Sequence, residues 1–299
     1  MKIFLIKSFL FIFLVVFTLF PIFRYISKDF SDRFYDKFLY KAPSLIIGSS
    51  RALYALMPEH INNNRKINKP FLNFGFTMAT SPYGEVYYDA MMKKVKSNNT
   101  PGVFILEVNP LTVSLKRDTL PETKLILNRL KFFNMNPNID YILKNSQHPI
   151  YLFFLKNNAN QTPDEKNKSS DILSSTVDTA SKIKAGIKAY QKVFGEIHIS
   201  DYRLNWLEKT IASLKPYGKV ILVRVPITVE MKRLENNYCP QFNQLMRDIA
   251  LKRETLYMDF SEADNYNFHD AHHMTSTSAN NFSEMLGDTI NTFELSKRK

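Results

Sequence analysis

Cysteine is almost absent from this 299-residue chain, because Cys239 is the single one. One cysteine excludes an intrachain disulfide and any zinc site built from several thiolates. Glycine is scarce as well, with 8 residues, and the sequence contains neither a G-x-G-x-x-G run nor a Walker A loop. These absences argue against a dinucleotide- or phosphate-binding domain, and no cofactor is expected.

Acidic residues are in the minority, since 40 Lys and Arg against 28 Asp and Glu give a formal net charge of +12. The basic residues are spread along the chain without a recognised nucleic-acid motif, so no nucleic-acid partner is expected. Two explanations stay open. The charge belongs to an ordinary solvated surface, or it attracts an acidic polymer or an anionic membrane surface.

The longest apolar run lies at the N-terminus, where residues 3–23 read IFLIKSFLFIFLVVFTLFPIF. A helix that spans a membrane needs about 20 apolar residues, and this run is long enough. A cleaved signal peptide is the competing interpretation, because Lys2 and Lys7 form a basic start. However, no small-residue cleavage pattern follows the run.

We therefore predict an uncleaved transmembrane signal anchor over residues 1–23 and a juxtamembrane linker over 24–42. The protein would then be a single-pass membrane protein. Its main domain, residues 43–299, would be exported to the periplasmic or extracellular side.

Short apolar runs alternate with helical patterns along the main domain. Continuous apolar strands separated by helices predict a parallel sheet that is covered on both faces. The expected fold class is α/β, a three-layer α/β/α sandwich with a flavodoxin-like parallel sheet. A polar, partly helical insertion at about 110–200 interrupts the alternation, with a flexible loop near 156–180. Strands are predicted at 44–48, 71–76, 103–109, 219–225 and 255–260, helices at 82–96, 201–215, 230–252 and 278–295, and a short helix with a loop within 51–64.

The segment IIGSSR, residues 46–51, places two serines directly after a predicted strand. A serine in this position commonly caps the following helix. Alternatively, Ser50 is a nucleophile at the carboxyl end of the strand, where ligands of such sheets bind. A serine nucleophile needs a base, because its hydroxyl is unreactive at neutral pH.

The segment FHDAHHMT, residues 268–275, contains three of the six histidines. The carboxylate of Asp270 can reach the Nδ1–H of His273 across one turn, which would orient this imidazole as a base. A polar loop before the last helix is the plainer alternative. A metal site made from His269, Asp270, His272 and His273 is disfavoured, because neighbouring residues rarely converge on one ion and no HExxH frame is present.

Two further segments lie where predicted strands end. Asn109 precedes Pro110 and either starts a turn or donates its amide to a developing oxyanion. Gly75, in the segment NFGFTMATSP, precedes a loop that could present a main-chain N–H to the same oxygen.

Taken in order, these four segments resemble the blocks of the SGNH/GDSL hydrolase family, especially its membrane-anchored cell-envelope branch. Gly48-Ser49-Ser50 is similar to the serine block, the Gly75 loop to the second block, Glu107-Val108-Asn109-Pro110 to the third, and Asp270-Ala271-His272-His273 to the D-x-x-H block. The sequence departs from the family pattern at four positions, with Ser for Asp at 49, Met for Gly at 78, Glu for Gly at 107 and Pro for Asp at 110.

The resemblance implies a membrane-anchored serine esterase or O-acyltransferase with the catalytic residues Ser50, His273 and Asp270. It assigns the oxyanion hole to the backbone N–H groups of Ser50, Gly75 and Met78 and to the Asn109 amide. The expected partner is an acylated envelope polysaccharide or a lipid-linked glycan. Because the second and third blocks are altered, a catalytically degenerate binding or scaffold protein of an envelope assembly is the alternative.

Overall fold

The structure is a computed structural model that describes residues 2–28, 35–62, 70–76, 81–97, 99–117, 134–145 and 179–296. The chain forms two compact units, which are described separately. The first contains residues 1–40 and 129–175, and the second contains residues 41–128 and 176–299.

The first unit contains the N-terminal helix α1 (Lys2–Lys28). Its stretch Lys2–Ile22 is long and apolar enough to cross a membrane, although a signal sequence has the same properties. The helix continues past Pro21, so part of the predicted linker over 24–42 is helical. In the same unit, the 3₁₀ helix η1 (Tyr35–Phe38) packs against α6 (Ile139–Asn145) through ring contacts of Tyr141.

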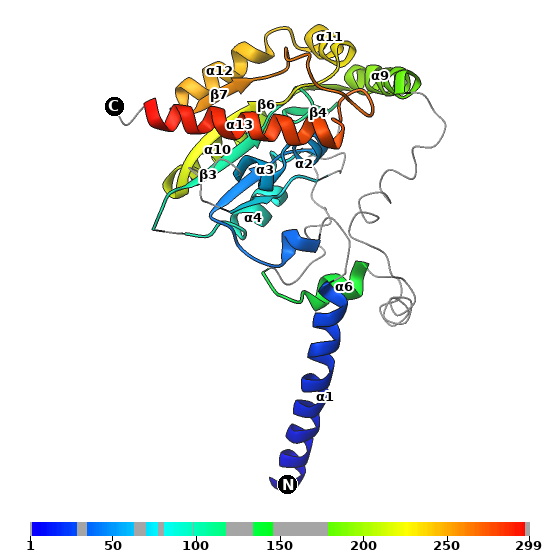
Figure 1. The fold of residues 1–299 in the computed structure, drawn as a ribbon, viewed down its shortest axis with the longest axis vertical. Helices are drawn as coiled ribbons and strands as arrows, with labels where there is room; N and C mark the ends of the chain where they lie inside the picture. Colours follow the sequence, from blue (N-terminus) through cyan, green and yellow to red (C-terminus); the bar gives the residue numbers. More distant parts are fainter. Residues whose placement is uncertain are drawn as a thin grey trace. The chain divides into compact units, whose positions relative to one another are not determined.

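The second unit is built on a five-stranded parallel sheet with the order β2-β1-β3-β6-β7 (Figure 1). If only these strands are counted along the chain, the order is 2-1-3-4-5, which is a common order of doubly wound sheets. The prediction of an α/β fold with a parallel sheet is therefore confirmed. The strands are β1 (Ser44–Ile47), β2 (Phe71–Asn73), β3 (Gly102–Glu107), β6 (Gly218–Arg224) and β7 (Leu256–Asp259).

The central strands have no polar face. Every residue of β1 and of β3 is buried, which explains why their sequences are continuous apolar runs rather than alternating ones. Parallel pairing brings the carboxyl ends of all five strands to one edge of the sheet. The residues that follow β1, β2 and β3 therefore meet at that edge, although they are far apart in sequence.

The helices of this unit pack in recognisable groups. Helix α13 lies along α2 and α3 (Figure 1), and α10 packs on β6 and α4. Helix α12 packs on β7, and α9 packs on α11. The bounds are α2 (Ser50–Ala55), α3 (Pro58–Asn62), α4 (Glu85–Met92), α9 (Thr179–Glu196), α10 (Asp201–Leu214), α11 (Val229–Tyr238), α12 (Phe242–Lys252) and α13 (Ser276–Ser296).

One predicted helix is two helices. The prediction placed a single helix over 230–252, whereas α11 ends at Tyr238 and α12 begins at Phe242. Pro240 lies between them and explains the break, because proline lacks the N–H that a continuous helix requires. Similarly, the helix predicted from Pro82 begins later, at Glu85, with Gly84 as its N-cap.

The predicted insertion has regular structure at both ends. Strand β4 (Ser114–Lys116) pairs antiparallel with β5 (Ile197–Ile199), and α9 directly precedes β5. The insertion therefore leaves and rejoins the main domain through a two-stranded sheet. Of the loop predicted near 156–180, residues 156–178 lie outside the described residues. Residues 179 and 180 belong to α9.

Candidate active site

Ser50 lies at the first position of α2, immediately beyond the buried strand β1. Ser49 is the N-cap of this helix, and its Oγ accepts a hydrogen bond from the Arg51 backbone N–H at 3.3 Å. The capping role considered for this serine pair therefore falls to Ser49, which leaves the Ser50 hydroxyl available for another partner. The turn needs glycine at position 48, because a Cβ there would lie 2.5 Å from the Ala52 Cβ.

Asp270 organises the loop before α13. Its Oδ1 accepts the backbone N–H groups of His272 and His273, both at 2.9 Å. The His269 N–H donates to the His273 carbonyl at 2.9 Å, and Thr228 Oγ1 donates to the Ala271 carbonyl at 2.7 Å. These bonds fix the backbone of the loop, so that Asp270 Oδ2 remains available for a side chain.

The structure brings Ser50, His273 and Asp270 into one hydrogen-bonded chain. His273 Nδ1 lies 2.8 Å from Asp270 Oδ2, and His273 Nε2 lies 2.8 Å from Ser50 Oγ. With Nδ1 donating to the carboxylate, Nε2 is the acceptor for the serine proton. The His273 side chain is 21% exposed, so the hydrogen-bonded chain is not closed off from solvent.

The environment of Asp270 keeps its carboxyl group ionised. Burial opposes ionisation, but the hydrogen bond and charge interaction with His273, together with the His272 N–H, hold the pKa of Asp270 well below its usual range. An ionised carboxylate on Nδ1 stabilises the imidazolium that forms when His273 takes a proton.

His272 is directed away from the serine. Its Nε2 lies 3.2 Å from the Tyr190 hydroxyl of α9, and its ring meets the Tyr190 ring edge-on. Burial, followed by the nearby charges of Arg51 and His273, lowers the pKa of His272 to about 2. The sequence patterns contained no signal for Tyr190, because this residue lies at the end of the polar insertion.

The ligand atoms of Asp270, His272 and His273 lie within 4.8 Å of one another, as a metal site would require. However, both Asp270 oxygens already accept hydrogen bonds, and both His273 ring nitrogens have partners. The observed hydrogen bonds therefore describe a proton-transfer chain better than a ligand set for a cation.

The groups predicted to form the oxyanion hole are less well arranged than Ser50, His273 and Asp270, because some of their N–H groups already have other acceptors. The Gly75 N–H donates to Asn73 Oδ1 at 2.9 Å, so this N–H is already engaged. Asn109 is buried, and its Oδ1 accepts the N–H of Leu111 at 2.8 Å. This bond is the one expected if Asn109 starts a turn, which was one of the two interpretations of this residue. Its Nδ2 donates one hydrogen to Glu107 Oε1 at 2.5 Å, which leaves its second N–H for another acceptor. Met78 lies outside the described residues.

Comparison with known proteins adds no assignment. No family model matches the chain, and no curated protein matches it. One solved crystal structure is similar over 87% of this chain and 98% of its own, with 8% sequence identity and a TM-score of 0.38. A likeness at this level carries no argument about fold or function.

A buried ion network lies next to the turn at Ser49 and Ser50, and the sequence patterns did not indicate it. Arg51 Nη2 lies 2.6 Å from Glu235 Oε1, and Arg224 Nη2 lies 2.8 Å from Glu235 Oε2. All three side chains are almost completely buried. The network connects the start of α2 to the end of β6 and to α11, and so holds these elements together next to Ser50.

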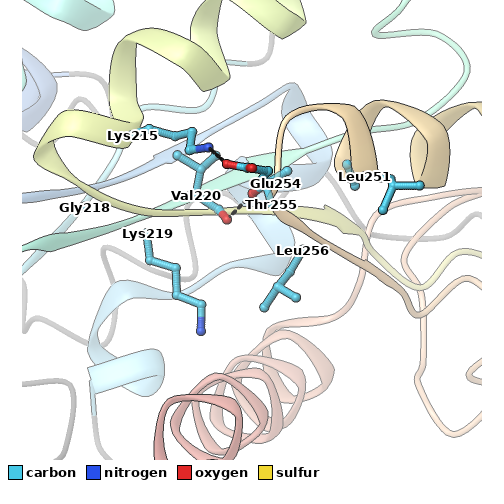
Figure 2. Close-up of a pocket in the computed structure, with 9 residues that line it drawn as sticks. Lys215, Gly218, Lys219, Val220, Leu251, Glu254, Thr255 and Leu256 are labelled. Carbon is cyan, nitrogen blue, oxygen red and sulfur yellow. Dashed lines mark hydrogen bonds and ion pairs between the residues drawn. The ribbon is translucent and has the colours of Figure 1, made fainter. Parts of the chain in front are cut away.

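A separate hollow of about 420 Å³ lies at the opposite edge of the sheet, where β6 and β7 begin (Figure 2). Lys215 Nζ donates to Glu254 Oε2 at 3.1 Å there, and Thr255 donates to the Val220 carbonyl. None of the residues that line this hollow belongs to the hydrogen-bonded chain of Ser50. The hollow is therefore distinct from the candidate active site.

Proposed function

We propose that this protein is a serine esterase or O-acyltransferase that works through Ser50, His273 and Asp270. The observation that carries the proposal is the continuous hydrogen-bonded chain, with 2.8 Å from Ser50 Oγ to His273 Nε2 and 2.8 Å from His273 Nδ1 to Asp270 Oδ2. Each distance lies within the range required for proton transfer between a nucleophile and its base.

The chemistry follows from this arrangement. Ser50 Oγ attacks the ester carbonyl while its proton passes to His273 Nε2, and Asp270 stabilises the imidazolium. His273 then returns the proton to the departing alkoxide, so that an alcohol leaves and an acyl-serine remains. In the second half, the acceptor attacks the acyl carbonyl while its proton passes to His273, and the bond to Ser50 breaks as His273 returns that proton to Ser50 Oγ. Water as acceptor gives hydrolysis, and a sugar hydroxyl gives acyl transfer.

The SGNH/GDSL resemblance supports the same proposal. The sheet order of the second unit suits a flavodoxin-like sheet, and Ser50 follows β1 while Asn109 follows β3, at the carboxyl edge where such folds bind ligands. Helices α13, α2 and α3 pack together, and α10 packs with α4 and β6. We assign these two groups to the outer layers of a three-layer α/β/α sandwich.

The proposed substrate is an acylated cell-envelope polysaccharide or a lipid-linked glycan. Helix α1 would anchor the protein in a bacterial inner membrane, with the domain of residues 43–299 on the exported side. A net charge of +12 suits an anionic polymer, which a basic surface attracts over several ångströms.

A second candidate function is that of a catalytically degenerate scaffold in an envelope assembly. One observation favours it, namely that the Gly75 N–H is engaged by Asn73 rather than directed at an oxyanion. Loss of one oxyanion donor lowers kcat by about 10²–10³-fold in serine hydrolases, so an incomplete hole would leave little activity.

The decisive experiment compares full-length, detergent-solubilised wild type with Ser50→Ala and His273→Ala. Fluorophosphonate labelling and p-nitrophenyl acetate hydrolysis are measured for each. His269→Ala is the matched control, because His269 lies in the same loop but is exposed. We expect labelling to be lost without Ser50, to fall at least about 100-fold without His273 and to stay unchanged in the control. A folded wild type that is neither labelled nor active on small or glycan esters would support the scaffold.

A further inference from the structure

Glu107 is a completely buried acidic residue that takes no part in the hydrogen-bonded chain of Ser50. It is the last residue of β3, and its backbone carbonyl accepts the Tyr83 hydroxyl at 2.6 Å. A carboxylate is strongly destabilised away from water unless several donors surround it. The partners of Glu107 therefore indicate why a carboxylate is present here.

Three donors meet the Glu107 carboxylate, and all of them come from the two segments beside the nucleophile. Oε2 accepts the Ser49 N–H at 3.0 Å and the Ser49 hydroxyl at 2.8 Å. Oε1 accepts an N–H of the Asn109 amide at 2.5 Å. One side chain thus holds the residue that precedes the nucleophile together with the residue assigned as an oxyanion donor.

The contacts also require a carboxylate rather than another polar group. A carboxylate accepts hydrogen bonds at both oxygens and donates none, so it matches a set of three donors. An amide at the same position would turn an NH₂ group toward either Ser49 or Asn109, where a donor already lies. The surroundings are closely packed, because a Cβ on Gly48 would lie 2.7 Å from the Glu107 Cβ.

We propose that Glu107 is a positioning residue that fixes the nucleophile turn at Ser49 and the Asn109 amide relative to each other. The catalytic part of this inference rests on the proposed function. The SGNH/GDSL resemblance is consistent with it, because position 49, where that family more commonly has Asp, carries Ser, and position 107, where it has Gly, carries Glu.

The test uses full-length protein with Glu107→Gln, and Glu262→Gln as the matched control, since Glu262 is 71% exposed. We expect Glu107→Gln to slow fluorophosphonate labelling of Ser50 and to lower kcat by about 10–100-fold, with KM changed by less than about threefold. The control is expected to label at the wild-type rate. A folded Glu107→Gln protein that labels within about twofold of wild type would overturn the inference.

A rescue variant separates positioning from a general loss of structure. Ser49→Asp/Glu107→Gly places a carboxylate on the turn at position 49 in place of the one at position 107, and should label within about tenfold of wild type. If Glu107→Gln does not fold, this double variant decides. A folded double variant with near-wild-type labelling supports the inference, and a folded one with slow labelling overturns it. If neither variant folds, the inference is also overturned, because the Glu107 carboxylate would then be needed for folding rather than for positioning.

A second readout keeps the inference distinct from the proposed function. Hydrogen exchange of the peptide that covers residues 46–51 includes the Ser49 N–H, which donates to Glu107 Oε2. If folded wild type is not labelled at Ser50, the proposed function fails, and exchange alone decides the role of Glu107. Faster exchange in Glu107→Gln than in Glu262→Gln supports the inference, and equal exchange overturns it.

Discussion

The imidazole of His272 lies against the imidazole of His273, with ring centroids 3.9 Å apart. His272 is buried, and its pKa is lowered to about 2, so it stays neutral beside His273. A second imidazolium at this distance would oppose the protonation of His273. We infer that burial of His272 lets His273 accept a proton without facing a like charge.

The first prediction concerns stability against pH. In the unfolded chain His272 binds a proton below about pH 6.5, whereas in the folded protein it does so only near pH 2. The unfolded state therefore binds more protons as the pH falls through this window, and stability falls with it. By pH 5 the loss attributable to His272 reaches up to about 2 kcal/mol.

Urea unfolding of wild type and His272→Phe between pH 8 and pH 5 measures this difference. The free energy of unfolding should fall more steeply in wild type than in the variant. His269→Phe, at an exposed histidine in the same loop, should follow wild type. Equal pH dependence in wild type and His272→Phe would contradict the prediction.

The second prediction concerns the orientation of the base. In Asp270→Asn, the amide oxygen can keep the N–H groups of His272 and His273, while its NH₂ faces His273 Nδ1. This exchange selects the tautomer that carries its proton on Nε2, which cannot accept the serine proton. We expect kcat to fall by about 10³–10⁴-fold with a melting temperature close to that of wild type. A fall of less than about tenfold would argue against this role for Asp270.

The third prediction concerns the ion network behind Ser50. Glu235→Gln removes the charge that Arg51 and Arg224 share, so that both buried guanidinium groups lose an ion-pair partner. Breaking a buried ion pair from one side costs about 3–5 kcal/mol. Urea unfolding should show a loss of this order.

The comparison for this measurement is Glu262→Gln, which removes an exposed partner of Lys232. Exposed pairs contribute about 0–1 kcal/mol, so the control should stay near wild type. If both variants lost the same stability, the network would have no special role.

The fourth prediction compares two glycines. Gly48→Ala would place a Cβ 2.5 Å from the Ala52 Cβ, whereas Gly195→Ala in α9 would meet no heavy atom within 4 Å. Overpacking costs about 1–3 kcal/mol, while alanine in a helix is favoured over glycine by roughly 0.5–1 kcal/mol. We therefore expect opposite signs in thermal unfolding. A tolerated Gly48→Ala with wild-type labelling would contradict the packing described for the nucleophile turn.

Features that depend on neighbouring residues could be predicted from the sequence. The strands β1 and β3 appear as apolar runs because a strand buried on both faces has no polar side to display. The membrane-length helix α1 is equally local, since its length and apolar composition are properties of one segment. The break between α11 and α12 could also have been predicted, because Pro240 alone explains it. The prediction of one helix over 230–252 overlooked this proline.

The candidate site could be predicted only in part. Ser50, Asp270 and His273 were named from their positions after a strand and before a helix, and the tertiary structure brings them within hydrogen-bond distance. Gly75 was named for its backbone N–H, which Asn73 instead engages. The hydrogen bonds of a particular N–H depend on the side chains that fold around it, and no local pattern contains that information.

The sequence by itself determined which segments form the five strands of the parallel sheet, which segment can enter a membrane, and which side chains have the chemistry of a nucleophile, a base and an orienting acid. Only the tertiary structure decided how they combine. It set the strand order, brought Tyr190 of the insertion to His272, and buried Glu107 among donors from Ser49 and Asn109. These relationships join residues from separate strands, helices and loops. They arise from parallel pairing and the exclusion of water, which act between segments rather than within one.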